Sequence, residues 1–344
     1  MRQRQYAVCS LLLSISMVVM LSAVARAQPS TPAPTALVYH PDYLLHDPGP
    51  SHPERPARLR AVMDHLQRQG LSDTLLRLHP EPAAELWITR VHTPVYVQQL
   101  KAAVQAAPAQ LDADTRVSKH SYDVARLAVG GVLLAVDAVM AGQAQNAFAA
   151  LRPPGHHALA DRAMGFCLFN YVAIATRYVQ EKHGMARVLI VDWDAHHGNG
   201  TQDVFFADPS VLFFSTHQYP YYPGTGAASE TGTGAGQGTT INVPLAAGSG
   251  DEEIIAAFQE RLLPAANAFR PDFVFLSAGF DAHRRDPLAQ LQVTESGYAR
   301  LTRIVKDIAE QHAAGRLVSV LEGGYDLDAL ARSVEAHLRV LTGK

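Results

Sequence analysis

The segment Val188-Leu-Ile-Val-Asp-Trp-Asp-Ala-His-His-Gly-Asn-Gly-Thr201 joins an apolar run to a cluster of acidic residues and histidines. Such a run is typical of a strand buried on both faces of a parallel sheet, and these sheets bind ligands at the carboxyl ends of their strands. Because side chains alternate along an extended backbone, we expect Asp192, Asp194 and His196 to point to one side, where they would suit a divalent metal ion. A lone segment of this kind is more often a set of solvated polar residues, so the other strand ends decide the interpretation.

The length and composition of the chain predict a large folded core. The 344 residues are 48% hydrophobic and 18% charged, which is compatible with one large α/β domain or two smaller ones. No internal repeat or linker divides residues 35–344, so we predict one domain there. Residues 28–34 are rich in Pro, Ser and Thr and are predicted to be a flexible leader to that domain.

The amino terminus has the layout of a secretory signal peptide. Arg2 and Arg4 precede a long apolar run, 6–24, which is followed by Ala25-Arg-Ala27. We therefore predict cleavage after Ala27 and a periplasmic or secreted protein that is not attached to a membrane after cleavage. The length of the apolar run also allows an uncleaved membrane anchor.

The charge and cysteine content of the mature chain exclude two classes of protein. Removal of residues 1–27 takes away three of the 29 basic residues and none of the 32 acidic ones, which leaves a net charge of −6. This charge gives no general attraction to nucleic acid. Only Cys167 of the two cysteines remains, so no intramolecular disulfide can form.

Strand patterns alternate with helix patterns along the mature chain, which predicts an α/β fold with a mostly parallel central sheet and helices on both faces. The proline-rich segment 40–56 is predicted to be a loop without helix. The predicted strands are 35–39, 148–151, 188–191, 211–216, 240–243, 273–277 and 317–321. The predicted helices are 58–67, 83–90, 93–107, 119–141, 171–183, 251–269, 294–313 and 329–341.

Four predicted strands lead into reactive residues: His156-His157, the segment 192–197, Asp281 and Tyr325. A parallel sheet brings the carboxyl ends of its strands to one edge. Two carboxylates and one imidazole there would bind a metal ion and leave a position open for water. A neighbouring histidine would transfer a proton, and a tyrosine hydroxyl would stabilise an oxyanion. Together these groups are typical of an amide hydrolase.

These motifs, in this order along the chain, resemble the zinc-dependent histone deacetylase family, which shares its α/β sheet with arginase. The resemblance extends from about His40 to the carboxyl terminus. It implies the arginase/deacetylase fold, with Asp194, His196 and Asp281 as ligands of Zn²⁺. Fe²⁺ would also suit these ligands.

The resemblance also implies a catalytic role for each of five other residues. His157 would be the general base and acid, His156 its electrostatic partner, and Tyr325 the hydrogen-bond donor to the substrate carbonyl. Asp192 and Asn199 match the positions that hydrogen-bond the two histidines and orient their rings. An Asn at position 199, where some relatives have Asp, resembles the class II branch of the family.

A structural K⁺ is a further implication of the resemblance. The side chains of Asp192 and Ser215 would hold it together with the backbone of Asp194, His196 and Thr216.

The resemblance further implies a narrow tunnel for an acyl-lysine stem, walled by Gly165, Phe166 and Tyr222, with His217 nearby. Relatives selective for acetylpolyamines carry an acidic residue directly after an Asp-Pro pair that follows the third metal ligand. Here Leu288 follows that pair, which favours acyl-lysine or a similar amide with a neutral stem.

The expected partner is a small-molecule or peptide acyl-amine substrate, whose backbone Asp112 or Asp114 would bind. Chromatin is not the expected substrate, because the family is intracellular and this chain carries an export signal. Two alternatives remain: an acetylpolyamine amidohydrolase, and a non-catalytic protein that binds acyl groups. A homo-oligomer is also compatible with the sequence.

Overall fold

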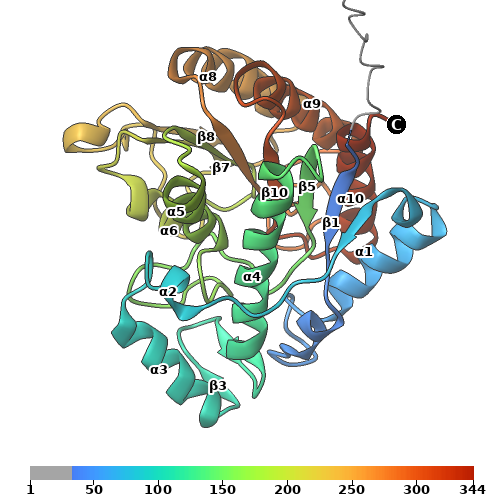
Figure 1. Ribbon diagram of the computed structural model, residues 1–344, viewed down its shortest axis with the longest axis vertical. Coiled ribbons are helices and arrows are strands. Elements are labelled where there is room, and N and C mark those ends of the chain that lie inside the picture. Colours follow the sequence, from blue (N-terminus) through green and yellow to red (C-terminus); the bar gives the residue numbers. More distant parts are fainter. Residues whose placement is uncertain (1–32) are drawn as a thin grey trace, which may run out of the picture. The chain divides into compact units, whose positions relative to one another are not determined.

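The computed structural model describes residues 33–344, which are coloured in Figure 1. The predicted signal peptide, 1–27, and most of the predicted leader, 28–34, lie outside the described residues. Ala33–Lys344 form one compact unit. Within this part of the chain, no helix has the length and apolar character needed to cross a bilayer.

An eight-stranded sheet in which every pair of neighbours is parallel forms the centre of the molecule, which confirms the predicted α/β class. The strand order is β2-β1-β5-β10-β9-β6-β7-β8. Every residue of β5, β6, β9 and β10 is buried, which explains why their sequences are apolar runs rather than alternating patterns. The strands are β1 Thr35–Val38, β2 Leu76–Leu78, β5 Asn146–Ala149, β6 Val188–Asp192, β7 Val211–Gln218, β8 Thr240–Leu245, β9 Phe273–Ala278 and β10 Leu317–Leu321.

Two groups of helices cover the sheet (Figure 1). Helix α4 packs on α5 and on β1, β5 and β10, whereas α10 packs between α1 and α9. The helices are α1 Ala57–Arg68, α2 Glu85–Ile88, α3 Pro94–Gln105, α4 Ser121–Met140, α5 Tyr171–His183, α6 Asn199–Phe205, α7 Asp251–Ala257, α8 Leu263–Phe269, α9 Glu295–His312 and α10 Leu327–Thr342.

Local capping residues determine where the helices next to the candidate site begin and end. The side chain of Asn170 accepts a hydrogen bond from the backbone N–H of Ala173 (3.0 Å), and Asp326 does the same for Ala329 (2.8 Å). Helix α5 ends at Gly184, whose φ of 68° is accessible to glycine at little cost. These caps fix the helices that follow the two strand ends β5 and β10.

The prediction of a helix-free loop at 40–56 was wrong in one part. Pro41–Leu45 forms a 3₁₀ helix, because proline tolerates the first helical position, where no N–H donor is needed. The predicted continuous helix 251–269 contains a π-helical turn, Phe258–Leu262, ahead of Pro264, which lacks an N–H. The strand β2, the helix α6 and the small antiparallel pair β3 Ala109–Gln110 and β4 Arg116–Val117 were not predicted.

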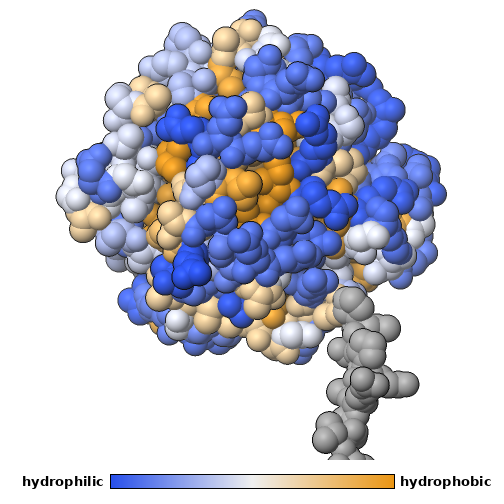
Figure 2. Space-filling model, turned by 90° about the horizontal axis from the view of Figure 1, so that it is seen from above, coloured by the Kyte–Doolittle hydropathy of each residue, from blue (hydrophilic) through white to orange (hydrophobic). Residues whose placement is uncertain are grey.

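Figure 2 shows hydrophobic residues gathered in the middle of one face and surrounded by hydrophilic ones. Among residues 33–344, the exposed large hydrophobic side chains are Leu45, Leu86 and Val95. Scattered exposed apolar side chains of this kind are common on folded proteins.

A buried ion pair anchors the 40–56 segment to the end of β5. The Glu54 carboxylate accepts hydrogen bonds from Nε and Nη2 of Arg152, both at 2.8 Å, and from Arg58 at 3.4 Å. None of these three side chains is exposed to solvent. Burial alone would raise the pKa of Glu54, but Arg152, His46 and Arg58 together lower it well below its usual range.

We predict that Glu54→Gln lowers the free energy of unfolding by about 3–5 kcal/mol, because Arg152 would be left buried without a counter-charge. Urea unfolding at neutral pH measures this change. The matched control is Asp161→Asn, which removes an exposed pair with Arg162 and should cost about 1 kcal/mol or less. Equal stability of the two variants would contradict an anchoring role for Glu54.

Candidate active site

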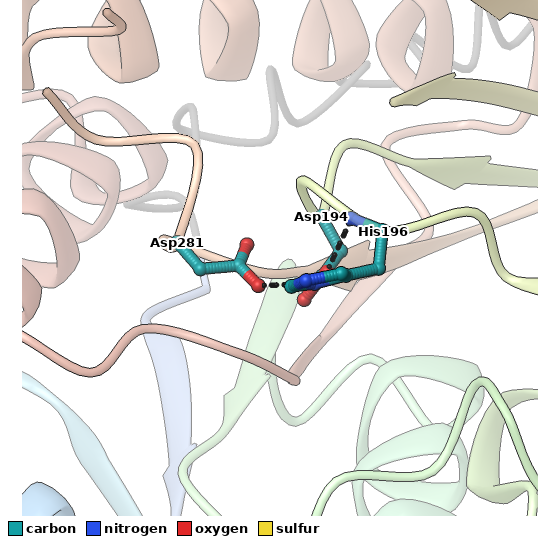
Figure 3. Close-up of side chains that lie close together, drawn as sticks. All are labelled: Asp194, His196 and Asp281. Carbon is teal, nitrogen blue, oxygen red and sulfur yellow. Dashed lines mark hydrogen bonds and ion pairs between the residues drawn. The ribbon is translucent and has the colours of Figure 1, made fainter. Parts of the chain in front are cut away.

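The loops that leave β6 and β9 place three ligand-type side chains around one point. One potential ligand atom from each of Asp194, His196 and Asp281 lies within 4.8 Å of the other two. Nδ1 of His196 is 3.1 Å from Oδ1 of Asp194 and 2.9 Å from Oδ2 of Asp281 (Figure 3). All three side chains are buried. Two carboxylate oxygens and one imidazole nitrogen are a donor set that fits a divalent cation such as zinc.

Backbone groups hold the second oxygen of each carboxylate. Oδ1 of Asp281 accepts a hydrogen bond from Ala195 N (2.8 Å), and Oδ2 of Asp194 accepts one from Gly323 N (2.9 Å). Gly323 has to be glycine for this approach, because a Cβ atom there would lie 2.4 Å from Oδ2 of Asp281. In each carboxylate, one oxygen is therefore held by a backbone N–H group, and the other oxygen points toward His196.

Electrostatics within this cluster favour a positive charge between the carboxylates. Burial alone would lower the pKa of His196, but Asp194 and Asp281 raise it well above its usual value. Without a cation, the two buried carboxylates thus favour the protonated form of the imidazole. A divalent cation would replace that proton.

The His156-His157 pair follows the turn after β5 and is held by two different partners. Nδ1 of His156 lies 2.9 Å from Oδ2 of Asp192, and Nδ1 of His157 lies 2.7 Å from Oδ1 of Asn199. Against the effect of burial, Asp192 and Asp194 raise the pKa of His156 to about 10. Burial and the neighbouring His156 and His196 lower the pKa of His157 well below its usual value. These surroundings therefore favour the protonated form of His156 and the neutral form of His157.

Tyr325 follows β10 and lines the same cavity as the histidine pair. Its backbone N–H donates to Oδ2 of Asp286 (2.7 Å), and its ring meets Phe166 edge-on, with 5.8 Å between ring centroids. The guanidinium carbon of Arg58 lies 4.9 Å from the centroid of the Tyr325 ring. Burial raises the pKa of Tyr325 well above its usual value, so its hydroxyl keeps its proton and can donate it to a hydrogen bond.

A cavity of about 210 Å³ connects these groups with the surface. Asp192, Asn199, Asp194 and Asp281 lie behind its wall rather than in its lining. The lining residues are Asp114, Pro154, His156, His157, Gly165, Phe166, His196, Tyr221, Tyr222, Leu288 and Tyr325.

The structure does not place His217 in this lining. Its Nδ1 lies 2.9 Å from Oγ of Ser215 and its Nε2 lies 2.8 Å from the carbonyl oxygen of Gly226, and the side chain is fully buried. His217, which was expected near the tunnel, thus supports the loop that carries Tyr222 and is not itself part of the cavity lining.

Tyr221 was not among the predicted site residues, although it contacts both the triad and the tunnel wall. Its ring stacks on His196 with 5.7 Å between centroids, and its hydroxyl donates a hydrogen bond to the carbonyl oxygen of Leu288. The sequence Tyr219-Pro-Tyr-Tyr-Pro223 gave no signal of which tyrosine would face the metal site, because a loop has no side-chain period.

Asp112 and Asp114, the two residues predicted as alternatives for binding the substrate backbone, have different surroundings. Oδ1 of Asp112 accepts the backbone N–H groups of Asp114 (3.0 Å) and Thr115 (2.6 Å), so it stabilises its own turn. Asp114 lines the cavity. The hydroxyl of Thr115 in turn accepts the backbone N–H of Phe166 (3.0 Å), which links this turn to the tunnel wall.

Three of the five residues expected to hold a monovalent cation lie on neighbouring strands of the sheet. Asp192 pairs with Ser215 in the register of β6 and β7, and Thr216 follows directly. The hydroxyl of Thr216 is buried and has no hydrogen-bond partner among the described residues.

Comparison with known proteins gives the family. The model of the histone deacetylase domain matches residues 52–341. The chain is 44% identical to the probable deacetylase of Archaeoglobus fulgidus over 86% of this chain and 82% of that protein. It is 43% identical to polyamine deacetylase HDAC10 of Homo sapiens over 90% of this chain but only 48% of that protein. The crystal structure of the HDA15 HD domain matches with a TM-score of 0.87 and 40% identity, over 91% of this chain and 89% of that one. The chain therefore belongs to the histone deacetylase family.

Proposed function

We propose that this protein is a zinc-dependent amide hydrolase that removes an acetyl or other acyl group from a lysine-like amine. The observation that carries the proposal is the meeting of three groups at one cavity: the Asp194–His196–Asp281 triad, a neutral His157 and the hydroxyl-bearing Tyr325. Zn²⁺ suits the donor set, and Fe²⁺ would suit it as well.

A bound metal ion supplies Lewis-acid polarisation of a carbonyl and lowers the pKa of water. Three side chains of the protein would supply the proton transfer and the stabilisation of negative charge. His157, held by Asn199, takes a proton from the attacking water and returns it to the leaving amine. His156 stays cationic beside Asp192 and stabilises negative charge nearby. Tyr325 donates a hydrogen bond to the oxygen on which that charge develops.

The cavity walls support an acyl-amine with a long apolar stem as the substrate. The rings of Phe166 and Tyr222 and the bare backbone of Gly165 would enclose methylene groups. A Cβ atom on Gly165 would lie 2.4 Å from the ring of His157, so any side chain there would displace that base. The half-buried Asp114 would accept hydrogen bonds from substrate backbone amides.

An acetylpolyamine remains the second candidate substrate, because HDAC10, a polyamine deacetylase by name, is 43% identical to this chain. Leu288 in the lining argues for a neutral stem instead, since it offers no charge to a polyamine. A non-catalytic role in acyl-group binding is the weaker hypothesis, because every side chain that the proposed mechanism requires is present.

We also propose that the protein acts after export to the periplasm, on the strength of its amino-terminal sequence. Its substrate would then be an acylated peptide or small amine outside the cytoplasm. A K⁺ ion held near Asp192, Ser215 and Thr216 would be structural, as the neighbouring positions of these residues in β6 and β7 suggest.

Tyr325→Phe should lower kcat by about 10²–10³-fold, because one hydrogen bond to the transition state is lost. The measurement is steady-state hydrolysis of an acetyl-lysine peptide by the zinc-loaded enzyme. Tyr222→Phe is the matched control: it also removes a hydroxyl from the cavity lining, one that has no partner among the described residues, and should keep most of kcat. Wild-type kcat in Tyr325→Phe would show that its hydroxyl has no such role.

Leu288→Glu should shift substrate preference from acetyl-lysine peptide toward acetylputrescine by roughly tenfold, because a carboxylate in the tunnel wall attracts the free ammonium of the polyamine. The ratio of the two kcat/KM values measures this shift. Leu288→Gln, similar in size but uncharged, should leave the ratio near its wild-type value. A ratio that moves equally in both variants would refute the charge argument.

A further inference from the structure

Glu322, the residue after β10, connects three strand ends through its buried side chain. Oε2 accepts hydrogen bonds from the backbone N–H groups of Gly155 (2.6 Å) and His156 (3.2 Å), in the turn after β5. Oε1 accepts one from Oγ of Ser277 in β9, at 3.2 Å. The side chain is 1% exposed, so these contacts are shielded from water.

The backbone of Glu322 belongs to the segment that leads to Tyr325, and Arg58 binds this segment. Arg58 donates from Nη2 to the carbonyl oxygen of Glu322 and from Nε to that of Gly324 (2.6 Å), and its guanidinium lies over the Tyr325 ring. Glu322 therefore contacts the histidine turn with its side chain and belongs, through its backbone, to the segment that carries Tyr325.

The histidine turn depends on this contact because it lies outside regular secondary structure. Gly155 and His156 are buried, and their N–H groups would otherwise lack a partner at a cost of about 1–3 kcal/mol each. The carbonyl oxygen of His156 is fixed on the other side by the N–H of Thr201 (3.2 Å). The side chain of Glu322 thus sets the position of the turn relative to Tyr325.

We propose that Glu322 is a positioning residue that holds the imidazoles of His156 and His157 at the correct distance from the Tyr325 hydroxyl, an inference that rests on the proposed amide hydrolysis. Its hydrogen bonds, rather than its charge, carry this role. Burial raises the pKa of Glu322 to about 7, although His156 and the N–H of Gly155 act to lower it. The surroundings of the Glu322 carboxyl therefore do not strongly favour its ionised form.

Two substitutions separate hydrogen-bond geometry from charge. Glu322→Gln removes the charge but keeps an acceptor for Gly155 and His156 and gains a donor for Ser277. Glu322→Asp keeps the charge but withdraws the carboxylate by about 1.5 Å, the length of one carbon–carbon bond. Both variants retain a polar group at the buried position, so both are expected to fold.

The first measurement is kcat and KM of the zinc-loaded full chain on an acetyl-lysine reporter. Glu322→Asp should lower kcat on the order of 10²-fold, as expected for a displacement of about 1 Å in the catalytic groups, with KM little changed. Glu322→Gln should keep most of kcat. Glu335→Asp is the matched control: it shortens a carboxylate that binds His65 and Arg339, away from the cavity lining, and should leave kcat unchanged.

The second measurement is the chemical shift of the Gly155 amide proton in the metal-free protein. This shift reports the hydrogen bond from Gly155 to Glu322 independently of enzymatic activity. It should move in Glu322→Asp and stay near its wild-type position in Glu322→Gln. Wild-type kcat in Glu322→Asp, or an equal loss in both variants, would overturn the proposal. A wild type that hydrolyses no acyl amide, with the Gly155 shift as expected, would refute the proposed function and still support Glu322 as the residue that fixes the turn.

Discussion

Two buried carboxylates, Asp194 and Asp281, face the same imidazole of His196, and the burial of this negative charge is the constraint on which the site depends. Carboxylates removed from water need a nearby positive charge and fixed hydrogen-bond donors. The backbone N–H groups of Ala195 and Gly323 supply the donors. Glycine at position 323 lets the chain approach closely enough to do so. The result is a pre-formed position for a cation.

The strand order explains how residues distant in sequence reach this position. β5, β10, β9 and β6 are consecutive neighbours in the sheet, and each leads into one part of the site. Because all four run in the same direction, their carboxyl ends meet at one edge. Asp192 and Asp194 raise the pKa of His156, whereas burial and the neighbouring histidines lower that of His157, so the two rings differ in their tendency to hold a proton. The position and charge of the proposed catalytic groups thus follow from the same sheet edge.

The sequence predicted the parallel sheet and the triad because both depend on local patterns: an apolar run and the residues that end it. It did not reveal the strand order, and so it missed contacts such as that of Glu322 with Gly155. The 3₁₀ helix at Pro41–Leu45 escaped prediction because proline breaks most helices but tolerates the first position. His217 lies in strand β7 and is buried there, whereas Tyr221 reaches the cavity through the path of the loop after this strand, which no periodic pattern encodes.

Metal-dependent hydrolysis of an acyl amide is tested most directly with acetyl-lysine and trifluoroacetyl-lysine reporters and purified protein that comprises residues 28–344. Fluorophore release is measured before chelation, after chelation and after Zn²⁺ is restored. We expect activity that disappears with the chelator and returns with Zn²⁺. Hydrolysis that persists in the fully metal-free protein would contradict this expectation, and so would inactivity toward both reporters and acetylputrescine when zinc is shown to be bound.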